Sequence, residues 1–367
     1  MLNLSLLGNT ASGRGGATVV DRPFGPVDGP LAVTPSSLAA PLAEADELPP
    51  LDLSQRPWPG RQLTAGGVTL HVRETPGPAD RTPAIYLHGL SGSGTNWTDL
   101  AAQLAPHAPG MALDLPGFGL SRPLASARYT PDAHADAVLC FLAGQGRPVH
   151  LLGNSLGGII AMLVAARRPE LVRSLTLLAP AMPDRRPDPR RVSDPKALLA
   201  LLPWMRGRMS RRLAQVTPRQ RVEQMIELCF GDTSTVVEHR VTEAVEEALR
   251  RAEQPWAREA LWQTTLGMIG GWFVGPRWWS VAARVTAPTL VVWGGRDRLV
   301  SPRLAQRTTV TLPSGRLLAM PEVGHIPQIE SPAMVARAVL GMWHAIELGH
   351  WRAPDGKIAR DRGVDAE

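Results

Sequence analysis

Ser155 stands in the run Gly153-Asn154-Ser155-Leu156-Gly157, between an apolar stretch typical of a buried strand and an apolar stretch with helical spacing. A serine on a tight strand-to-helix turn must hold a strained backbone conformation, and small flanking residues let the neighbouring chain pass close by. Such a turn places the serine Oγ at a helix N-terminus, where free N–H groups point toward developing negative charge. With 35 glycines in the chain the pattern alone is weak, but its place between strand and helix predicts a nucleophile.

A serine hydroxyl is a weak nucleophile at neutral pH, so it needs a histidine base and a carboxylate that orients the histidine. His325 lies on the loop after the last predicted strand, residues 316–320. Asp297 follows the strand predicted for residues 289–293. Parallel strands end at the same edge of a sheet, so both side chains are expected at the edge that carries Ser155.

Two rivals stay open for these roles. His88 ends the strand predicted for residues 84–87, although the next residue, Gly89, indicates a turn. Asp184 also follows a predicted strand and could serve as the acid, although it opens a Pro- and Arg-rich stretch. A third polar residue, Asp114, precedes a Pro- and Gly-containing run, and we interpret it as shaping a loop.

Five segments together resemble the α/β-hydrolase fold family and occur in its order over residues 62–347: His88-Gly89 with the loop after it, Asp114 to Gly119, the run around Ser155, Trp293 to Asp297, and Gly324-His325. The resemblance implies an α/β fold with an eight-stranded, mostly parallel sheet, helices on both faces and a helical lid inserted after strand six. It also implies an oxyanion hole made by the backbone N–H groups of Leu90 and Leu156, and a mechanism without metal or cofactor.

The elements that must position these residues follow one another as short β-branched runs and helical stretches. This alternation is what a mostly parallel sheet with crossover helices requires. It predicts a core in residues 61–182 and 284–350, interrupted by a helical lid in residues 183–283. Residues 1–60, rich in Gly, Pro, Ala and Ser, are predicted to form a disordered tail, and residues 351–367 a frayed one.

The predicted lid holds clustered apolar side chains beside arginines, a composition typical of acyl pockets. Trp262, Trp272 and Arg258 are the candidate substrate contacts, although the tryptophans would equally suit packing of the lid against the core. A carboxylic ester of a fairly apolar small molecule is therefore the first expectation for the substrate.

Two other functions stay open. The run around Ser155 is similar to that of hydrolases that cleave a C–C bond in vinylogous diketo acids, the meta-cleavage products of aromatic degradation. That branch often has tryptophan after its histidine, whereas this chain has Ile326. A catalytically silent binding protein would be expected to have lost one of the three catalytic residues, and all three are present.

The composition limits the classes of partner and the cellular location that we expect. A formal charge of +6 arises from 39 basic and 33 acidic residues spread along the chain, so a nucleic-acid partner is not expected. No apolar run reaches the roughly 18 residues of a spanning helix, and Cys140 and Cys229 form no disulfide or zinc motif. We expect a cytoplasmic enzyme acting on a small molecule, without stable membrane insertion, and leave the oligomeric state open.

Overall fold

The computed structural model describes residues 36–124, 126, 128–184, 216–273 and 277–351. Eight strands form one sheet in the order β1-β2-β4-β3-β5-β6-β7-β8. Strand β2 runs antiparallel to β1 and β4, and every other pairing is parallel. The predicted eight-stranded, mostly parallel sheet is thus confirmed. Its strands are β1 (Gly60–Ala65), β2 (Val68–Thr75), β3 (Ala84–Leu87), β4 (Gly110–Leu113), β5 (Val149–Asn154), β6 (Val172–Leu178), β7 (Thr289–Gly294) and β8 (Gly315–Met320).

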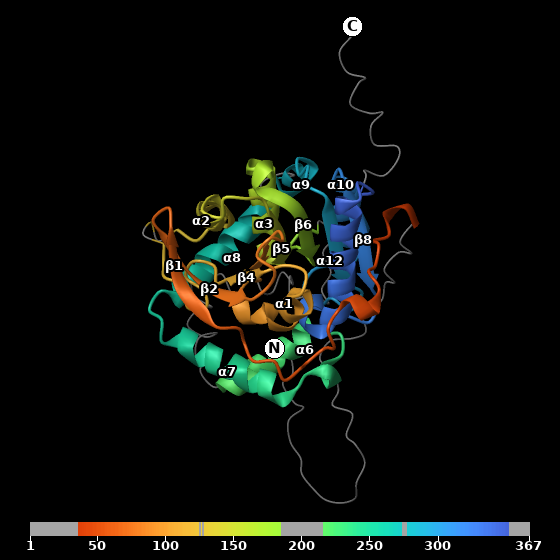
Figure 1. Cartoon of the computed structure of the whole chain (residues 1–367). Helices are drawn as coiled ribbons and strands as arrows, with labels where there is room; N and C mark the ends of the chain where they lie inside the picture. Colours follow the sequence, from red (N-terminus) through yellow and green to blue (C-terminus); the bar gives the residue numbers. More distant parts are fainter. Residues whose placement is uncertain (1–35, 125, 127, 185–215, 274–276, 352–367) are drawn as a thin grey trace, which may run out of the picture.

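The central strands are buried on both faces, which explains their unbroken apolar runs. In β3, Ile85 and Leu87 belong to one hydrophobic cluster, and Ala84 and Tyr86 to the cluster on the opposite face. Two helical layers cover the two faces (Figure 1). One contains α1 (Thr98–Leu104) and α12 (Pro332–Glu347), and the other α2 (Pro131–Ala143), α3 (Leu156–Arg167), α9 (Arg277–Ala283) and α10 (Leu304–Thr311).

Between β6 and β7 the described part of the chain is helical. This stretch, called the helical insertion below, contains α6 (Pro218–Cys229), α7 (Glu238–Ala252) and α8 (Ala257–Phe273) before α9. Helix α6 begins with a capping box between Thr217 and Gln220, with Pro218 at its first position. Helices α6 and α7 lie side by side at the lower edge of the molecule in Figure 1. Residues 185–215 of the predicted lid lie outside the described residues.

The N-terminal segment departs from the prediction of a disordered tail up to residue 60. Residues 36–59 pack on the core, burying Leu38, Ala43 and Leu48. The Trp58 indole N–H donates to the carbonyl oxygen of Thr98 at 3.1 Å. The prediction was wrong because it relied on the absence of a periodic apolar face. A segment that packs along the surface of an already folded core needs only scattered apolar residues. Residues 1–35 and 352–367 lie outside the described part. Among the described helices, none is long and apolar enough to cross a membrane.

Candidate active site

Ser155 occupies the turn between β5 and α3 with φ 53° and ψ −113°. Such a positive φ is costly for a residue with a Cβ and persists only where the surroundings enforce it. The turn is too tight for larger neighbours: a Cβ at Gly157 would lie 2.2 Å from the Leu87 carbonyl oxygen, and one at Gly153 would lie 2.3 Å from that of Gly157. The sequence therefore folds into a strained elbow that presents Ser155 at the N-terminus of α3.

His325 and Asp297 form a buried pair on the loops after β8 and β7. The Nδ1 atom of His325 lies 2.8 Å from Oδ2 of Asp297. The other carboxylate oxygen accepts the backbone N–H groups of Leu299 and Val300 at 2.8 and 2.9 Å, which fixes its orientation. Because a carboxylate only accepts hydrogen bonds, Nδ1 carries the imidazole proton and Nε2 keeps a free lone pair. The pair can therefore present a base.

The side chain of Asn154 ties the histidine loop to the serine turn. Its buried amide donates to the carbonyl oxygen of His325 at 3.1 Å and to that of Leu178 at 3.0 Å. The Ser155 N–H also donates to the Leu178 carbonyl, at 2.9 Å. Sequence reasoning treated Asn154 only as a flanking residue. Nothing local signals its role, because its partner lies 171 residues away.

The two rivals are engaged elsewhere. Asp184 forms an ion pair with Arg303 at 3.1 Å. His88 is fully buried, and its Nε2 accepts the N–H of Leu115 at 2.9 Å while its Nδ1 contacts the carbonyl oxygen of Gly89 at 2.7 Å. Burial lowers the pKa of His88, so it stays neutral in this structural role. Of the two candidate acids, only Asp297 is seen paired with His325.

The loop after β3 passes directly over the serine turn. A Cβ at Gly89 would lie 3.1 Å from Oδ1 of Asn154 and 3.3 Å from the Cβ of Ser155, so a larger residue here would press on the serine turn. The N–H of Leu90 follows on this loop, and the N–H of Leu156 is the first of α3, where a helix leaves its donors unpaired. Both predicted oxyanion donors thus belong to segments that border Ser155.

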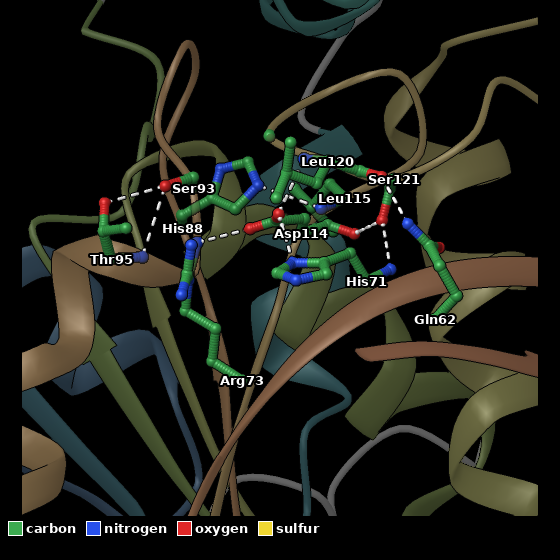
Figure 2. A network of polar contacts seen from close by, with 12 residues as sticks. Gln62, His71, Arg73, His88, Ser93, Thr95, Asp114, Leu115, Leu120 and Ser121 are labelled. Carbon is green, nitrogen blue, oxygen red and sulfur yellow. Dashed lines mark hydrogen bonds and ion pairs between the residues drawn. The ribbon is translucent and has the colours of Figure 1, made fainter. Parts of the chain in front are cut away.

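Asp114 also contacts this loop, and Figure 2 shows its side chain between His71 and Leu120. Its carboxylate accepts the N–H of Gly94 at 2.6 Å and of Leu120 at 2.8 Å, and it lies 2.8 Å from Nδ1 of His71. Burial by itself would raise the pKa of Asp114, but the hydrogen bond from His71, the neighbouring His88 and the two backbone donors together lower it. The expected loop-shaping role of Asp114 agrees with these contacts.

Glu330, at the end of α11 (Pro327–Glu330), joins the histidine loop to the helical insertion. One carboxylate oxygen accepts the N–H of Gly324, next to His325, at 2.7 Å. The carboxylate also accepts the N–H groups of Gly231 and Asp232, with the shortest distances 3.0 and 2.9 Å. No sequence pattern signals this residue, because its three donors are backbone groups.

Replacing Glu330 with Gln should lower the free energy of unfolding by about 1.5–3 kcal/mol, because a charge-assisted acceptor is lost and an amide N–H₂ then faces backbone donors. Urea unfolding followed by tryptophan fluorescence measures the change. Glu322→Gln is the control, since Glu322 lies on the same loop but its ion pair with Arg296 is exposed. Equal midpoints for the two variants would contradict the supporting role of Glu330.

The three predicted substrate contacts lie on α8. Trp272 is half-buried, and its indole N–H donates to the carbonyl oxygen of Ala181 at 3.0 Å. Ala181 in turn donates its N–H to the carbonyl oxygen of Ser155 at 3.1 Å. Trp262 is half-buried and Arg258 is exposed. The described residues contain no group of three His, Cys, Asp or Glu side chains that could hold a metal ion.

Comparison with known proteins decides the family. The sequence pattern of the α/β hydrolase fold family matches residues 82–332. The chain belongs to this family. It is therefore an enzyme of the α/β-hydrolase type, and the relatives below are similar to it at modest identity.

Two curated relatives and one solved structure are representative. The acetyltransferase component of the acetoin cleaving system of Pseudomonas putida is 29% identical, covering 79% of this chain and 70% of its own length. The pimeloyl-[acyl-carrier protein] methyl ester esterase of Neisseria meningitidis is 28% identical, covering 70% and 91%. A putative lipase of Acinetobacter baumannii shares the fold with a TM-score of 0.65 at 20% identity, covering 80% and 93%.

Proposed function

We propose that this α/β-hydrolase is a serine carboxylesterase that acts through an acyl-enzyme on an ester of a fairly apolar small molecule. The observation that carries the proposal is the buried pair of His325 and Asp297, which Asn154 fastens to the strained turn bearing Ser155. A nucleophile, an oriented base and a neighbouring helix N-terminus are the parts that acyl transfer requires.

The reaction then follows from these groups. Ser155 Oγ attacks the ester carbonyl carbon while Nε2 of His325 accepts its proton. The N–H groups of Leu90 and Leu156 stabilise the oxyanion, and each such donor is worth about two to three orders of magnitude in rate. Asp297 keeps the imidazolium oriented. The carbon–oxygen bond to the alcohol then breaks as His325 gives its proton to the leaving oxygen, which leaves an acyl group on Ser155. Water attacks this acyl-enzyme while His325 accepts the water proton, and His325 returns the proton to Ser155 Oγ as the acid is released.

Two observations support an ester substrate and a lid role for the helical insertion. The Neisseria relative, which matches over most of its length, is an ester hydrolase by its name. Helix α8 reaches the serine turn indirectly, because Trp272 donates to Ala181 and Ala181 donates to the backbone carbonyl oxygen of Ser155. This connection supports a place for α8 beside the acyl pocket. Trp272 and Trp262 are the proposed apolar contacts, and the exposed Arg258 the proposed polar one at the rim.

Active-site labelling with a fluorophosphonate, followed by a substrate comparison, tests the proposal. We expect one adduct per chain, located on Ser155 by peptide mass spectrometry. A p-nitrophenyl ester should give a burst of p-nitrophenol and a kcat/KM at least about 100-fold above that for a vinylogous diketo acid. An adduct elsewhere, or none, would overturn the serine hydrolase proposal. A reversed substrate preference would replace the ester by a C–C bond.

A further inference from the structure

Helix α7 of the helical insertion lies against the loop that carries Leu90. Glu247 Oε2 accepts the hydroxyl of Thr95 at 2.9 Å, and Glu247 Oε1 accepts Nη2 of Arg251 at 3.1 Å. The same Nη2 atom reaches the carbonyl oxygen of Gly92 at 3.4 Å. One turn of α7 thus contacts two positions of the loop, two and five residues after Leu90.

The contacts come from one face of α7. Arg240 begins this face and pairs with the buried Asp99 at 2.5 Å, and Glu247 and Arg251 follow at helical spacing. The side chains of Glu247 and Arg251 are only 17% and 22% exposed. The neighbouring pair of Glu246 and Arg250 has the same spacing, but it is 60% and 49% exposed and its atoms are 3.7 Å apart. The chain therefore contains a docked ion pair and a solvent-exposed counterpart in one helix.

The part of the loop next to Leu90 has few internal contacts. Ser91 has φ 64°, and one short turn, from the Gly92 N–H to the Gly89 carbonyl at 3.0 Å, closes it. The following residues, 93–96, are held by a capping box between Ser93 and Asn96. From the core side, Asp114 holds it through Gly94. From the other side, the described contacts are those of Thr95 and Gly92 with α7.

We propose that Glu247 and Arg251 are positioning residues of the catalytic centre, which hold the Leu90 N–H in place through Thr95 and Gly92. The inference rests on the proposed function, since it assigns these insertion residues to the oxyanion hole of that reaction. The seated insertion then keeps the loop in the conformation that stabilises the transition state. The contacts of Glu247 and Arg251 therefore increase the rate of acyl transfer, and they leave the affinity for the ester unchanged.

Glu247→Gln and Glu246→Gln, compared as full-length proteins, test this role. Displacing a catalytic donor by a fraction of an ångström to 1 Å lowers rates by about 10- to 100-fold. We expect Glu247→Gln to lower kcat for the p-nitrophenyl ester by about this factor with KM within threefold, and Glu246→Gln to match the wild type. A trifluoromethyl ketone, which forms an oxyanion on Ser155, should lose affinity in parallel with kcat, whereas the product acid should bind as before.

Thr95 supplies a second variant that leaves the ion pair intact. Thr95→Ser keeps the hydroxyl and should retain wild-type kcat. Thr95→Val, of nearly the same shape, removes the contacts of the hydroxyl with both Glu247 and Ser93, and should lower kcat at least as much as Glu247→Gln. Equal kcat values for Glu247→Gln and Glu246→Gln, or a change confined to KM or thermal stability, would overturn the positioning role. If the wild type labels at Ser155 but Glu247→Gln keeps full kcat, only this inference fails. Absence of labelling would instead overturn the proposed function.

Discussion

Replacing Ser155 with Ala should lower kcat by about six orders of magnitude, the scale on which serine proteases lose activity when the nucleophile is removed. The donors of the proposed oxyanion hole stay in place, so a slow reaction with water is expected to remain and KM to change little. The fold should be retained, because Ala and Ser both carry a Cβ and face the same strain at φ 53°. Single-turnover hydrolysis of a p-nitrophenyl ester, with thermal unfolding alongside, measures both effects.

Ser174→Ala is the matched control for the loss of a hydroxyl. Ser174 is buried in β6 and its Oγ lies 2.7 Å from Nδ1 of His150, remote along the strand from the serine turn. This variant should be less stable than the wild type but keep its kcat. An activity in Ser155→Ala within tenfold of the wild type would rule out Ser155 as the nucleophile.

Asp297→Asn should lower kcat by about four orders of magnitude, the loss seen when a serine protease triad receives this change. The hydrogen bonds explain why. The N–H groups of Leu299 and Val300 require an oxygen at the Oδ1 position, so the amide nitrogen of the substituted side chain would face His325. That nitrogen would then donate to Nδ1 and place the imidazole proton on Nε2, where no lone pair remains to accept the Ser155 proton.

Steady-state kinetics and the ¹⁵N chemical shifts of the His325 ring test this account together. The shifts should report the change of tautomer, and kcat the loss of the base. Asp184→Asn is the control, since Asp184 pairs with Arg303 and should be replaceable without loss of kcat. A larger loss for Asp184→Asn than for Asp297→Asn would show that the acid had been assigned to the wrong strand end.

The parts of the fold that were predictable have local causes. Residues 84–87 match β3 because an unbroken apolar run is the mark of a strand buried on both faces. Helices α2 and α12 each have a proline at the helix start, a local signal that favours the first helical position. The positions of Asp297 and His325 followed from the rule that parallel strands end at one edge of the sheet.

The parts that were missed depend on partners far away in the chain. Residues 36–59 are ordered by a surface that the rest of the chain builds, and β1 pairs with β2 in spite of an exposed, polar sequence. Asn154 and Glu330 form hydrogen bonds with backbone groups. Every residue type has such groups, so the sequence does not indicate which residues are the partners. Glu247 lies among many charged residues of one helix, and nothing in its local sequence indicates its contact with Thr95, 152 residues away.

The contacts of Glu330 with Gly231 and Asp232 limit which helical insertions this fold can accept in exchange for its own. The helical insertion leaves the sheet at β6 and returns at the adjacent β7, which looks like a convenient pair of splice points for exchanging substrate specificity. Yet its α6–α7 connection supplies two of the backbone donors that orient Glu330 beside the histidine loop. A transplanted insertion would have to present N–H groups at that same place, so recombination at these splice points is constrained by the shape of one inter-helix turn.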